Sequence, residues 1–476
     1  MAHPDWVMKH KTKGTEIRKI GKYYYIYKVR SEYDKEKKRA KKITEKFLGK
    51  ITEDGLIKPK LERALESQKN ISVKEFGASQ FISNESSDLI QNLKGIFPDT
   101  WKEIYTFAVF RFFYSSPIKN VQDHYHGSYL SDIILDAKVS PKTISKVLHS
   151  IGRQRQLIKK FLSKYIVEGE SIAIDLTHVF SLSENVISAT LGRNSQHEFT
   201  PQINLFLLFS LERMRPIFYR LVPGSIRDVS CLLLSMEESQ VKDIILVGDK
   251  GFYSSDNIKE LDTNKIRYIL PLRRNSQFID YTPLTLPGKK QFDGHFLFEN
   301  RVIWHYELGI DGKRIVTFLD GKLKVEEERD FLSRAEGDEL KMEQFHNKES
   351  RFGTISIITG LDIPPQRIFE LLKSRVEIEI TFDTFKNVLN ADRSYMRDDS
   401  AMEGWMFVNF IALLLYYKVY GLLISKDALS KYSPKDVILH LSRVFNVKIG
   451  DNWVASEIPK KTRLLIEKLE IDLNIT

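Results

Sequence analysis

Two kinds of apolar pattern divide the first part of the chain. Residues 14–30 alternate weakly between apolar and polar positions and carry four clustered tyrosines, which predicts β-strands. The Lys-rich run at residues 33–47 favours a helix, and residues 48–57, with two glycines around Glu-Asp-Gly, predict a turn or hairpin. These segments form a small module, which a Ser- and Asn-rich link at residues 68–87 follows.

Helical periodicity extends over residues 89–165. Ser140 and Pro141 are a helix-start signal, a capping residue followed by proline at the first helical position, and they predict a helix that runs on to residue 166. Together with a short helix at residues 131–137, this helix fits a helix-turn-helix or a helical hairpin in a bundle. The sequence favours neither of the two.

The period changes after Glu170, where apolar runs of strand length appear. Three closely spaced strands are followed by two more that alternate with helices at residues 227–241 and 255–265, which indicates a mixed α/β sheet. The predicted strands are residues 171–182, 203–211, 216–222, 243–249 and 267–272.

Residues 276–350 interrupt the α/β order, and their pattern predicts the hairpins of a β-rich insertion. A strand at 353–360 and a long helix from about Pro365 to Asn390 resume that order, and the chain is helical from Gly404 onward. The predicted domains are a basic N-terminal module and link (1–86), a helical domain (87–169), the first part of the catalytic core (170–275), the insertion (276–350), the second part of the core (351–400) and a helical C-terminal region (401–476).

The net charge is concentrated at the N-terminus. The 476-residue chain has 73 Lys and Arg against 63 Asp and Glu, a formal net charge of +10. Residues 1–60 contain 18 basic and 8 acidic side chains, so this segment carries the whole excess and the rest of the chain is balanced. A basic end on a neutral body indicates a polyanionic partner, either nucleic acid or an anionic membrane surface.

Composition argues against a membrane partner and for an intracellular protein. Cys231 is the only cysteine, which excludes an intramolecular disulfide and a cysteine zinc cluster. The N-terminus has charges and no apolar stretch typical of a signal peptide. The most apolar segment, residues 405–424, is interrupted by Asn409 and Lys418, which favours a buried core helix over a membrane span. We therefore expect a cytoplasmic, nucleoid-associated protein that binds nucleic acid.

Two aspartates stand at the ends of predicted core strands. Asp175 interrupts the apolar strand at residues 171–182, and Asp249 ends the strand at residues 243–249. Carboxylates in such positions are costly unless they are paired or bind a cation, and open α/β sheets place ligand sites at the carboxyl ends of their strands. Either aspartate alone could be an ordinary helix cap or loop residue, whereas the pair indicates one site.

A third carboxylate lies on the long helix before residue 390. An apolar stripe at spacings of 4, 3 and 4 predicts that this helix packs on the sheet; it consists of Ile378, Phe382, Phe385 and Leu389. Arg375, Glu379 and Lys386 form a second stripe beside the first. Glu377 lies about 200° round the helix from Glu379, so both cannot face one site. Ordinary surface pairing of Arg375 with Glu379 is the alternative interpretation.

These residues carry a resemblance to a known family. The order Ala-Ile-Asp-Leu-Thr around Asp175, Val-Gly-Asp-Lys-Gly around Asp249 and then Arg375-x3-Glu379-x6-Lys386 resembles the DDE transposases of prokaryotic insertion sequences, specifically the insertion sequence four superfamily. Similar pieces occur at residues 222–228 and 403–417, so the resemblance covers about residues 170–425. The motif tyrosine of the family falls on Leu372, which has neither a hydroxyl group nor an aromatic ring.

The resemblance implies a ribonuclease H-like catalytic core and a DNA transposase. Asp175, Asp249 and Glu379 would be catalytic and would hold two Mg²⁺ ions, with Mn²⁺ as a substitute, a donor set that suits hard divalent cations. Such an enzyme hydrolyses phosphodiesters at the element ends and joins the freed strand to target DNA. Arg375 and Lys386 would bind DNA phosphates. Family members act as dimers on paired terminal inverted repeats, so we expect a homodimer.

Two other functions fit the same residues. One is a catalytically inactive DNA-binding derivative, which the substitution at Leu372 favours and the intact acids oppose. The other is a different ribonuclease H-like nuclease, which cuts DNA without joining it. We interpret four further residues as structural: His124 and His126 as loop residues, Asp228 as a helix cap and Trp304 as a core residue of the insertion.

Overall fold

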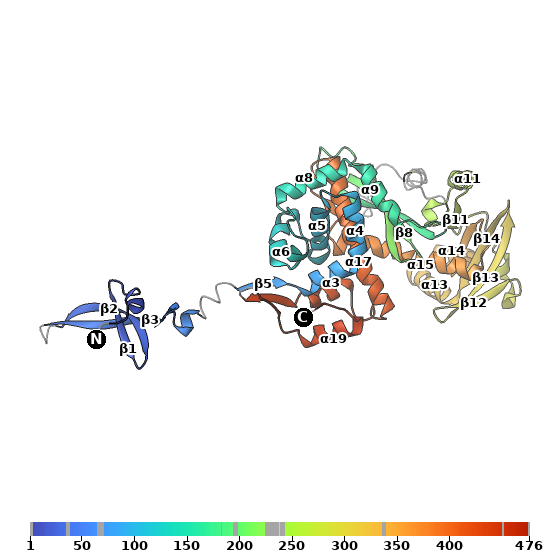
Figure 1. Ribbon diagram of the computed structural model, residues 1–476. Coiled ribbons are helices and arrows are strands. Elements are labelled where there is room, and N and C mark those ends of the chain that lie inside the picture. The colour runs from blue at the N-terminus through green and yellow to red at the C-terminus, as the bar shows by residue number, and fades with distance from the viewer. Residues whose placement is uncertain are drawn as a thin grey trace. The chain divides into compact units, whose positions relative to one another are not determined.

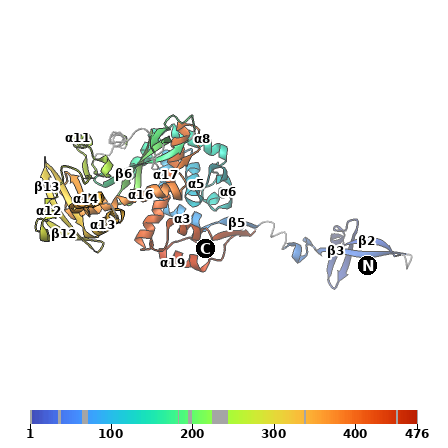
Figure 2. The same ribbon diagram turned by 180° about the vertical axis from the view of Figure 1, so that it is seen from behind.

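The computed structural model describes residues 3–34, 39–63, 71–181, 183–193, 199–223, 238, 243–335, 339–449 and 452–474. The chain divides into two compact units, whose elements Figures 1 and 2 label. Unit 1 consists of Met1–Phe76, Arg443–Pro459 and Asn474–Thr476, and unit 2 of Gly77–Ser442 and Lys460–Leu473. The helix predicted at residues 227–241 and the predicted cap Asp228 lie outside the described residues, apart from the single helical position Glu238.

The N-terminal part of unit 1 is a four-stranded antiparallel meander in the order β1-β2-β3-β4. Its strands are β1 (Thr15–Ile20), β2 (Tyr23–Asp34), β3 (Arg39–Thr52) and β4 (Gly55–Ile57), and a short helix, α1 (Asp5–Met8), precedes them. Val7, Ile17, Ile26 and Ile51 form a small core, which Trp6, Tyr24 and Leu48 cover.

The prediction of a helix at residues 33–47 was wrong, because most of this segment belongs to β3. Lys and Glu favour helices by local propensity, but here cross-strand pairing with β2 overrides that preference. The predicted hairpin at residues 48–57 is present as the β3–β4 turn, where Gly55 adopts a φ of 135° that other residues rarely take.

A second sheet of unit 1 joins segments far apart in the chain. β5 (Ile71–Glu75) pairs antiparallel with β17 (Phe445–Ile449), which pairs antiparallel with β18 (Asn452–Ala455). The predicted helical C-terminal region therefore also contains two strands. Its helices belong to unit 2 and include α18 (Pro434–Leu441) and α19 (Lys460–Leu469), as well as most of α17 (Asp399–Ser425).

Unit 2 begins with a bundle of helices. They are α3 (Gly77–Glu85), α4 (Ser87–Ile96), α5 (Trp101–Tyr114), α6 (Val121–Gly127), α7 (Leu130–Ile133), α8 (Pro141–Gly152) and α9 (Arg155–Leu162). The start signal was correct, since the Ser140 hydroxyl accepts a hydrogen bond from the Thr143 amide. The helix predicted to continue to residue 166 instead ends at Gly152, and α9 follows it after a short turn.

α8 packs in the core against α17 (Asp399–Ser425) at a close crossing. A Cβ atom on Gly152 would overlap the carbonyl oxygen of Ser400, and one on Gly404 would overlap that of Leu148. α17 lies between the helical bundle and the strands in both ribbon views (Figures 1 and 2). Its length and hydropathy would allow it to cross a membrane, but 72% of its most apolar window is buried in the protein, as predicted for a core helix.

The catalytic-core prediction of a mixed sheet is confirmed. β9 (Arg215–Pro223), β8 (Phe199–Ser210) and β6 (Ser171–Ser181) are antiparallel neighbours, while β10 (Ile245–Val247) and β11 (Arg267–Pro271) continue the sheet parallel to β6. All five strands fall where the apolar runs predicted them. Three smaller elements complete this part, namely β7 (Thr190–Arg193), α11 (Ser255–Thr263) and β16 (Arg393–Ser394).

The predicted insertion contains helices as well as β-hairpins. β12 (Gly294–Phe298), β13 (Arg301–Ile310) and β14 (Lys313–Asp320) form hairpins, and β14 joins the core sheet through β15 (Thr354–Thr359). The short helix α12 (Thr282–Thr285) precedes them. Two unpredicted helices, α13 (Gly321–Ala335) and α14 (Glu339–Lys348), lie between β14 and β15.

The long helix predicted from Pro365 to Asn390 is broken twice. It consists of α15 (Pro365–Ser374), α16 (Val376–Asp383) and a π-helical turn at Thr384–Val388. The predicted apolar stripe is nevertheless buried: Ile378 and Leu389 are 0% exposed, Phe385 1% and Phe382 8%. The segment therefore packs on the sheet as expected, while its two breaks redirect the charged side chains.

Candidate active site

The parallel pairing of β6 with β10 brings together Asp175, in the middle of β6, and Asp249, two residues after the end of β10. Val247, the last residue of β10, lies opposite Ala173, so the same register continued by two residues places Asp249 level with Asp175. Neighbouring strands lie about 4.8 Å apart, which puts the two carboxylates within electrostatic reach of each other. Asp249 also caps the turn after β10 by accepting a hydrogen bond from the Lys250 amide.

Arg375 joins the third carboxylate to the first. Its Nη2 donates to Asp175 Oδ2 at 2.8 Å and its Nη1 to Glu379 Oε1 at 2.8 Å. Arg375 is the residue at which α15 ends and α16 begins, and the break turns its side chain into the protein, where 11% of it remains exposed. The pairing of Arg375 with Glu379 is therefore not a simple surface ion pair, because the same guanidinium also binds the aspartate of the sheet.

The electrostatic environment of the site disfavours the ionised form of Asp175. Burial raises the pKa of Asp175 above its ordinary value, Arg375 and the Leu176 amide oppose this effect, and the charges of Asp249 and Glu379 raise the pKa further. Asp249 and Glu379 thus act on Asp175 through their charges, and the Arg375 guanidinium lies between Asp175 and Glu379. An additional cation at this point would favour the ionised form of all three.

Asp249, Arg375 and Glu379 line one cavity of about 330 Å³. Leu372 and Lys373 line it too, so the residue at the position of the family tyrosine presents an apolar side chain to the same space. Burial lowers the pKa of Lys373. Sequence reasoning missed this lysine, although its place directly after Leu372 was a usable signal.

The two remaining residues of the helical segment face elsewhere. The Tyr420 hydroxyl of α17 donates to Glu377 Oε2 at 3.4 Å, so Glu377 lies on the side away from the cavity. Lys386 lies in the π-helical turn, where its charge acts on His178 of β6 and on Asp392. The π-turn inserts one residue into the helical repeat and so displaces Lys386 from the stripe predicted with Arg375 and Glu379.

The donor set at this site fits a hard divalent cation. The converging side chains are carboxylates, with neither histidine nor cysteine among them, as Mg²⁺ and Mn²⁺ prefer. Within the part of the chain that the structure describes, no three His, Cys, Asp or Glu side chains are already arranged around a common metal position. At Asp175 and Glu379 the reason is Arg375, whose guanidinium bridges the two carboxylates.

The N-terminal meander carries a separate basic and aromatic face. Tyr25 and Tyr27 of β2 contact Phe47 of β3, with ring centroids 6.0 and 5.2 Å apart. Arg18 stacks over the ring of Tyr27 at 4.7 Å, and Lys50 lies 3.4 Å from the centroid of Tyr23. Alternating residues of β2 point to the same side, which places these tyrosines together on the face opposite the small core.

Two of the residues interpreted as structural have aromatic surroundings. His124 stacks on Tyr114 with ring centroids 4.5 Å apart, and burial lowers the pKa of His124. Trp304 of β13 contacts His295 at 4.8 Å and carries Lys289 over its ring. Both side chains thus pack against a neighbouring element. The prediction that His124 and His126 are loop residues was wrong, because both lie in α6.

Comparison with known proteins agrees with this geometry. The family model described as "Transposase DDE domain" matches residues 173–415, which is about half of the chain and contains Asp175, Asp249 and Glu379. No curated protein matches the chain. Among solved structures, a piggyBac transposase synaptic complex with hairpin DNA is similar over 77% of this chain and 76% of that one, at 12% identity and a TM-score of 0.40. On the family match, the chain belongs to the transposases that carry a DDE domain.

Proposed function

We propose that this protein is the transposase of a prokaryotic insertion sequence of the insertion sequence four superfamily. It hydrolyses phosphodiester bonds at the ends of its element and transfers the freed 3′ strand to target DNA. The observation that carries this proposal is the bridge of Arg375 between Asp175 and Glu379, with Asp249 within electrostatic reach of Asp175, on a core whose antiparallel and parallel strands fit a ribonuclease H-like sheet.

Asp175, Asp249 and Glu379 would hold two Mg²⁺ ions. When bound, the ions would supply an activated water and stabilise charge on the leaving 3′ oxygen. Burial keeps the aspartate of β6 in a site of low polarity, where charge interactions with the DNA phosphate are stronger than in water. Arg375 lies at the cavity, so its guanidinium can pass from the carboxylates to a phosphate oxygen.

The partners follow from the same proposal. The protein binds the terminal inverted repeats of its element and the target DNA, and it acts as a homodimer on paired ends. The basic, tyrosine-rich face of the N-terminal meander supports a role in holding DNA phosphates. The nucleoid of the cytoplasm is the compartment that this function requires.

The first prediction tests the assignment of the third acid. Asp175→Ala, Asp249→Ala and Glu379→Ala should each lower Mg²⁺-dependent nicking of a duplex that carries the element end by at least about a hundredfold, because each removes a metal ligand. Glu377→Ala is the matched control, since it is two residues away and faces Tyr420 instead of the cavity. Nicking by gel assay with circular dichroism of each variant separates catalysis from folding.

The same assay discriminates the two alternatives. An inactive DNA-binding derivative would bind the end and cut nothing even as the wild-type protein. A ribonuclease H-like nuclease of another kind would cut without joining, so the assay includes a labelled target plasmid. Normal nicking by Glu379→Ala together with loss of activity in Glu377→Ala would show that the third acid is misassigned.

A further inference from the structure

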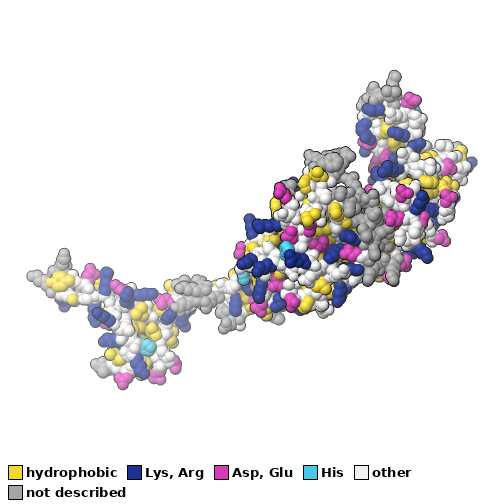
Figure 3. Space-filling model, turned by 90° about the horizontal axis from the view of Figure 1, so that it is seen from above, with side chains coloured by type: hydrophobic (Ala, Val, Ile, Leu, Met, Phe, Trp, Pro, Cys, Tyr) yellow, Lys and Arg dark blue, Asp and Glu magenta, His cyan; other side chains and the backbone are white. Residues whose placement is uncertain are grey.

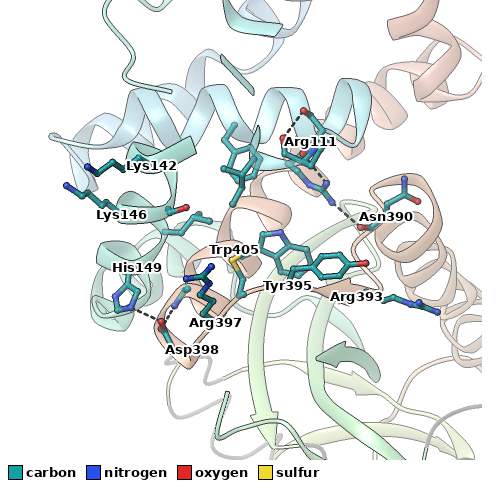
Figure 4. A pocket seen from close by; sticks show the side chains of 18 of the residues that line it. Arg111, Lys142, Lys146, His149, Asn390, Arg393, Tyr395, Arg397, Asp398 and Trp405 are labelled. Carbon is teal, nitrogen blue, oxygen red and sulfur yellow. Dashed lines mark hydrogen bonds and ion pairs between the residues drawn. The ribbon is translucent and has the colours of Figure 1, made fainter. Parts of the chain in front are cut away.

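A large cavity lies between α8 and the segment after β16, outside the carboxylate site. Its volume is about 790 Å³, and Lys142, Lys146, Arg393, Tyr395 and Arg397 contribute to its lining. We call this cavity the strand pocket. Figure 4 shows the side chains of α8 on one side of it, with Arg397 and Tyr395 between them and Arg393. α8 lies at the top of unit 2 in Figure 1, and the view from above shows Lys and Arg side chains gathered on this face (Figure 3).

The wall that α8 provides is one polar stripe of the helix. Lys142, Ser145, Lys146 and His149 recur at the helical spacing of 3, 4 and 7 and all line the strand pocket. The opposite stripe of Ile144, Leu148 and Ile151 is buried. No ion pair engages Lys142 or Lys146 within the described part of the chain, so their charges face the cavity without an acidic partner.

The second wall is an extended segment in which exposed residues alternate with covered ones. Arg393, Tyr395 and Arg397 are exposed, whereas Ser394 is buried and Met396 is half-buried, so the three exposed side chains share one face. Tyr395 is 86% exposed. The carboxylate that lines the pocket, Asp398, is already bound by His149 Nε2 at 2.8 Å. The strand pocket therefore presents an excess of positive charge together with a free aromatic ring.

β6 connects the strand pocket to the carboxylates. Arg393 of β16 pairs with Phe180 of β6, five residues beyond Asp175 on the same strand. At about 3.3 Å per residue, the distance along β6 from Asp175 to Phe180 is about 17 Å. Lys386 acts on His178, which lies between these two points. Arg375 and Arg393 therefore mark two points of positive charge along this strand, one at Asp175 and one opposite Phe180.

We infer that the strand pocket binds a single DNA strand about 17 Å along β6 from the carboxylate site at which the phosphate is cleaved. Its lysines and arginines hold the phosphates, and Tyr395 stacks on an unpaired base. A basic groove with an aromatic platform is the arrangement that binds single strands with little sequence preference. The position of this strand relative to the reaction rests on the proposed function, whereas the binding itself does not.

The test measures binding by the full chain without requiring cleavage. A fluorescein-labelled single strand of about 20 nucleotides and mixed sequence, and the corresponding duplex, are titrated by anisotropy between roughly 50 and 200 mM salt. The double variant Lys142→Ala/Lys146→Ala should weaken single-strand binding at least about tenfold. It should also lower the salt slope, which is the slope of log affinity against log salt concentration, by about one, since about 0.7 counterion is released per phosphate contact. Lys160→Ala/Lys259→Ala, which removes two exposed lysines outside the pocket, should change neither.

Tyrosine variants separate stacking from charge. Tyr395→Ala should weaken single-strand binding about fivefold or more with an unchanged salt slope, and Tyr395→Phe should retain wild-type affinity because its ring still stacks. Wild-type affinity in both Tyr395→Ala and the double lysine variant would overturn the inference. Equal losses for the single strand and the duplex would overturn the assignment to an unpaired strand.

Failure of the proposed function gives a different result. If the wild-type protein cuts no element end but the pocket variants still lose single-strand binding, the strand pocket stands and the catalytic assignment fails. If nicking depends on the three acids while the pocket variants bind normally, the catalytic assignment stands and the strand pocket fails.

Discussion

Arg375 is the residue that determines the state of the carboxylate site. Its guanidinium binds Asp175 and Glu379 at the same time, so it supplies positive charge to two acids that would otherwise repel each other. A divalent cation held by the same acids would perform the same electrostatic task. In the proposed function, arginine and metal would therefore compete for these oxygens, and the arginine would become available for DNA when the metal is bound.

This competition gives the second prediction. Arg375→Ala should lower the Tm of the metal-free protein, because three carboxylates then interact without a cation, and Mg²⁺ or Mn²⁺ should raise the Tm of the variant more than that of the wild type. Arg375→Lys is the control, since it keeps the charge but cannot bridge both acids. Differential scanning fluorimetry over a metal titration measures both shifts. A metal-induced shift in Arg375→Ala that is no larger than in the wild type would contradict the competition.

The buried ammonium group of Lys435 in α18 lowers the free energy of unfolding in a pH-dependent way, and this effect is separate from the active site. Burial and the nearby Arg111 lower the pKa of Lys435 to about 8, while its ammonium group donates to the carbonyl oxygens of Phe112 and Phe113 at the end of α5. In the unfolded chain the ordinary pKa is 10.5. Between these values the unfolded state binds more protons, so the free energy of unfolding rises with pH.

The third prediction follows from that sign. From pH 7.5 to about pH 9.5 the wild type should gain stability relative to Lys435→Met by at most about 3 kcal/mol, at about 1.4 kcal/mol per pKa unit. Urea denaturation at both pH values measures the difference, and Lys461→Met, an exposed lysine of α19, should show no such gain. The same pH dependence of the free energy of unfolding in the wild type and in Lys435→Met would exclude this destabilisation by Lys435.

At the scale of elements, the crossing of α8 and α17 depends on two glycines. Gly152 lies against the backbone of Ser400 and Gly404 against that of Leu148, so neither position has room for a Cβ atom without separating the helices. This crossing holds the charged stripe of α8 next to the segment after β16. The strand pocket therefore depends on the packing of backbone against backbone beneath it.

The fourth prediction compares two glycines of one helix. Gly404→Ala should lower the free energy of unfolding by about 1–3 kcal/mol or more, as overpacking does, and should weaken single-strand binding as well. Gly421→Ala on the same helix has open space around its Cβ position and should be neutral or stabilising by up to about 1 kcal/mol. Chemical denaturation of both variants measures the two changes in the free energy of unfolding. Similar changes for the two substitutions would show that the helix crossing tolerates a side chain at Gly404.

The sequence predicted the strands of the core better than the elements around it. The apolar runs correctly predicted the strand that contains Asp175 and the strand that precedes Asp249, because burial in a sheet dominates this signal. The break at Arg375 and the π-turn at Lys386 do not follow from a 3.6-residue period, since each depends on contacts with β6. α13 was missed although Lys324 and Glu328 form a helical i,i+4 pair, because the preceding hairpin pattern was extended too far.

At the scale of the whole molecule, basic charge occurs in two places with different roles. The excess of the sequence lies in residues 1–60, on a meander with an aromatic face, while the balanced remainder still gathers cations at the strand pocket. A net charge of zero after residue 60 therefore does not mean that unit 2 lacks a surface for DNA. The sequence pointed to the first place and not to the second, which only the packing of α8 beside β16 creates.

The fifth prediction separates these two contributions by deletion. Removing residues 1–60 eliminates the meander and the whole net charge but leaves β5, whose pairing with β17 covers that edge of the second sheet. The shortened protein should keep its Tm, bind duplex DNA more weakly and show a flatter dependence of affinity on salt, because fewer counterions are released. Its single-strand binding through the strand pocket should still be sensitive to Lys142→Ala/Lys146→Ala.

Removing residues 1–76 is the comparison, since loss of β5 exposes the edge of β17 and should lower the Tm or cause aggregation. An unchanged salt slope after removal of residues 1–60 would show that the N-terminal charge serves solubility and not DNA binding.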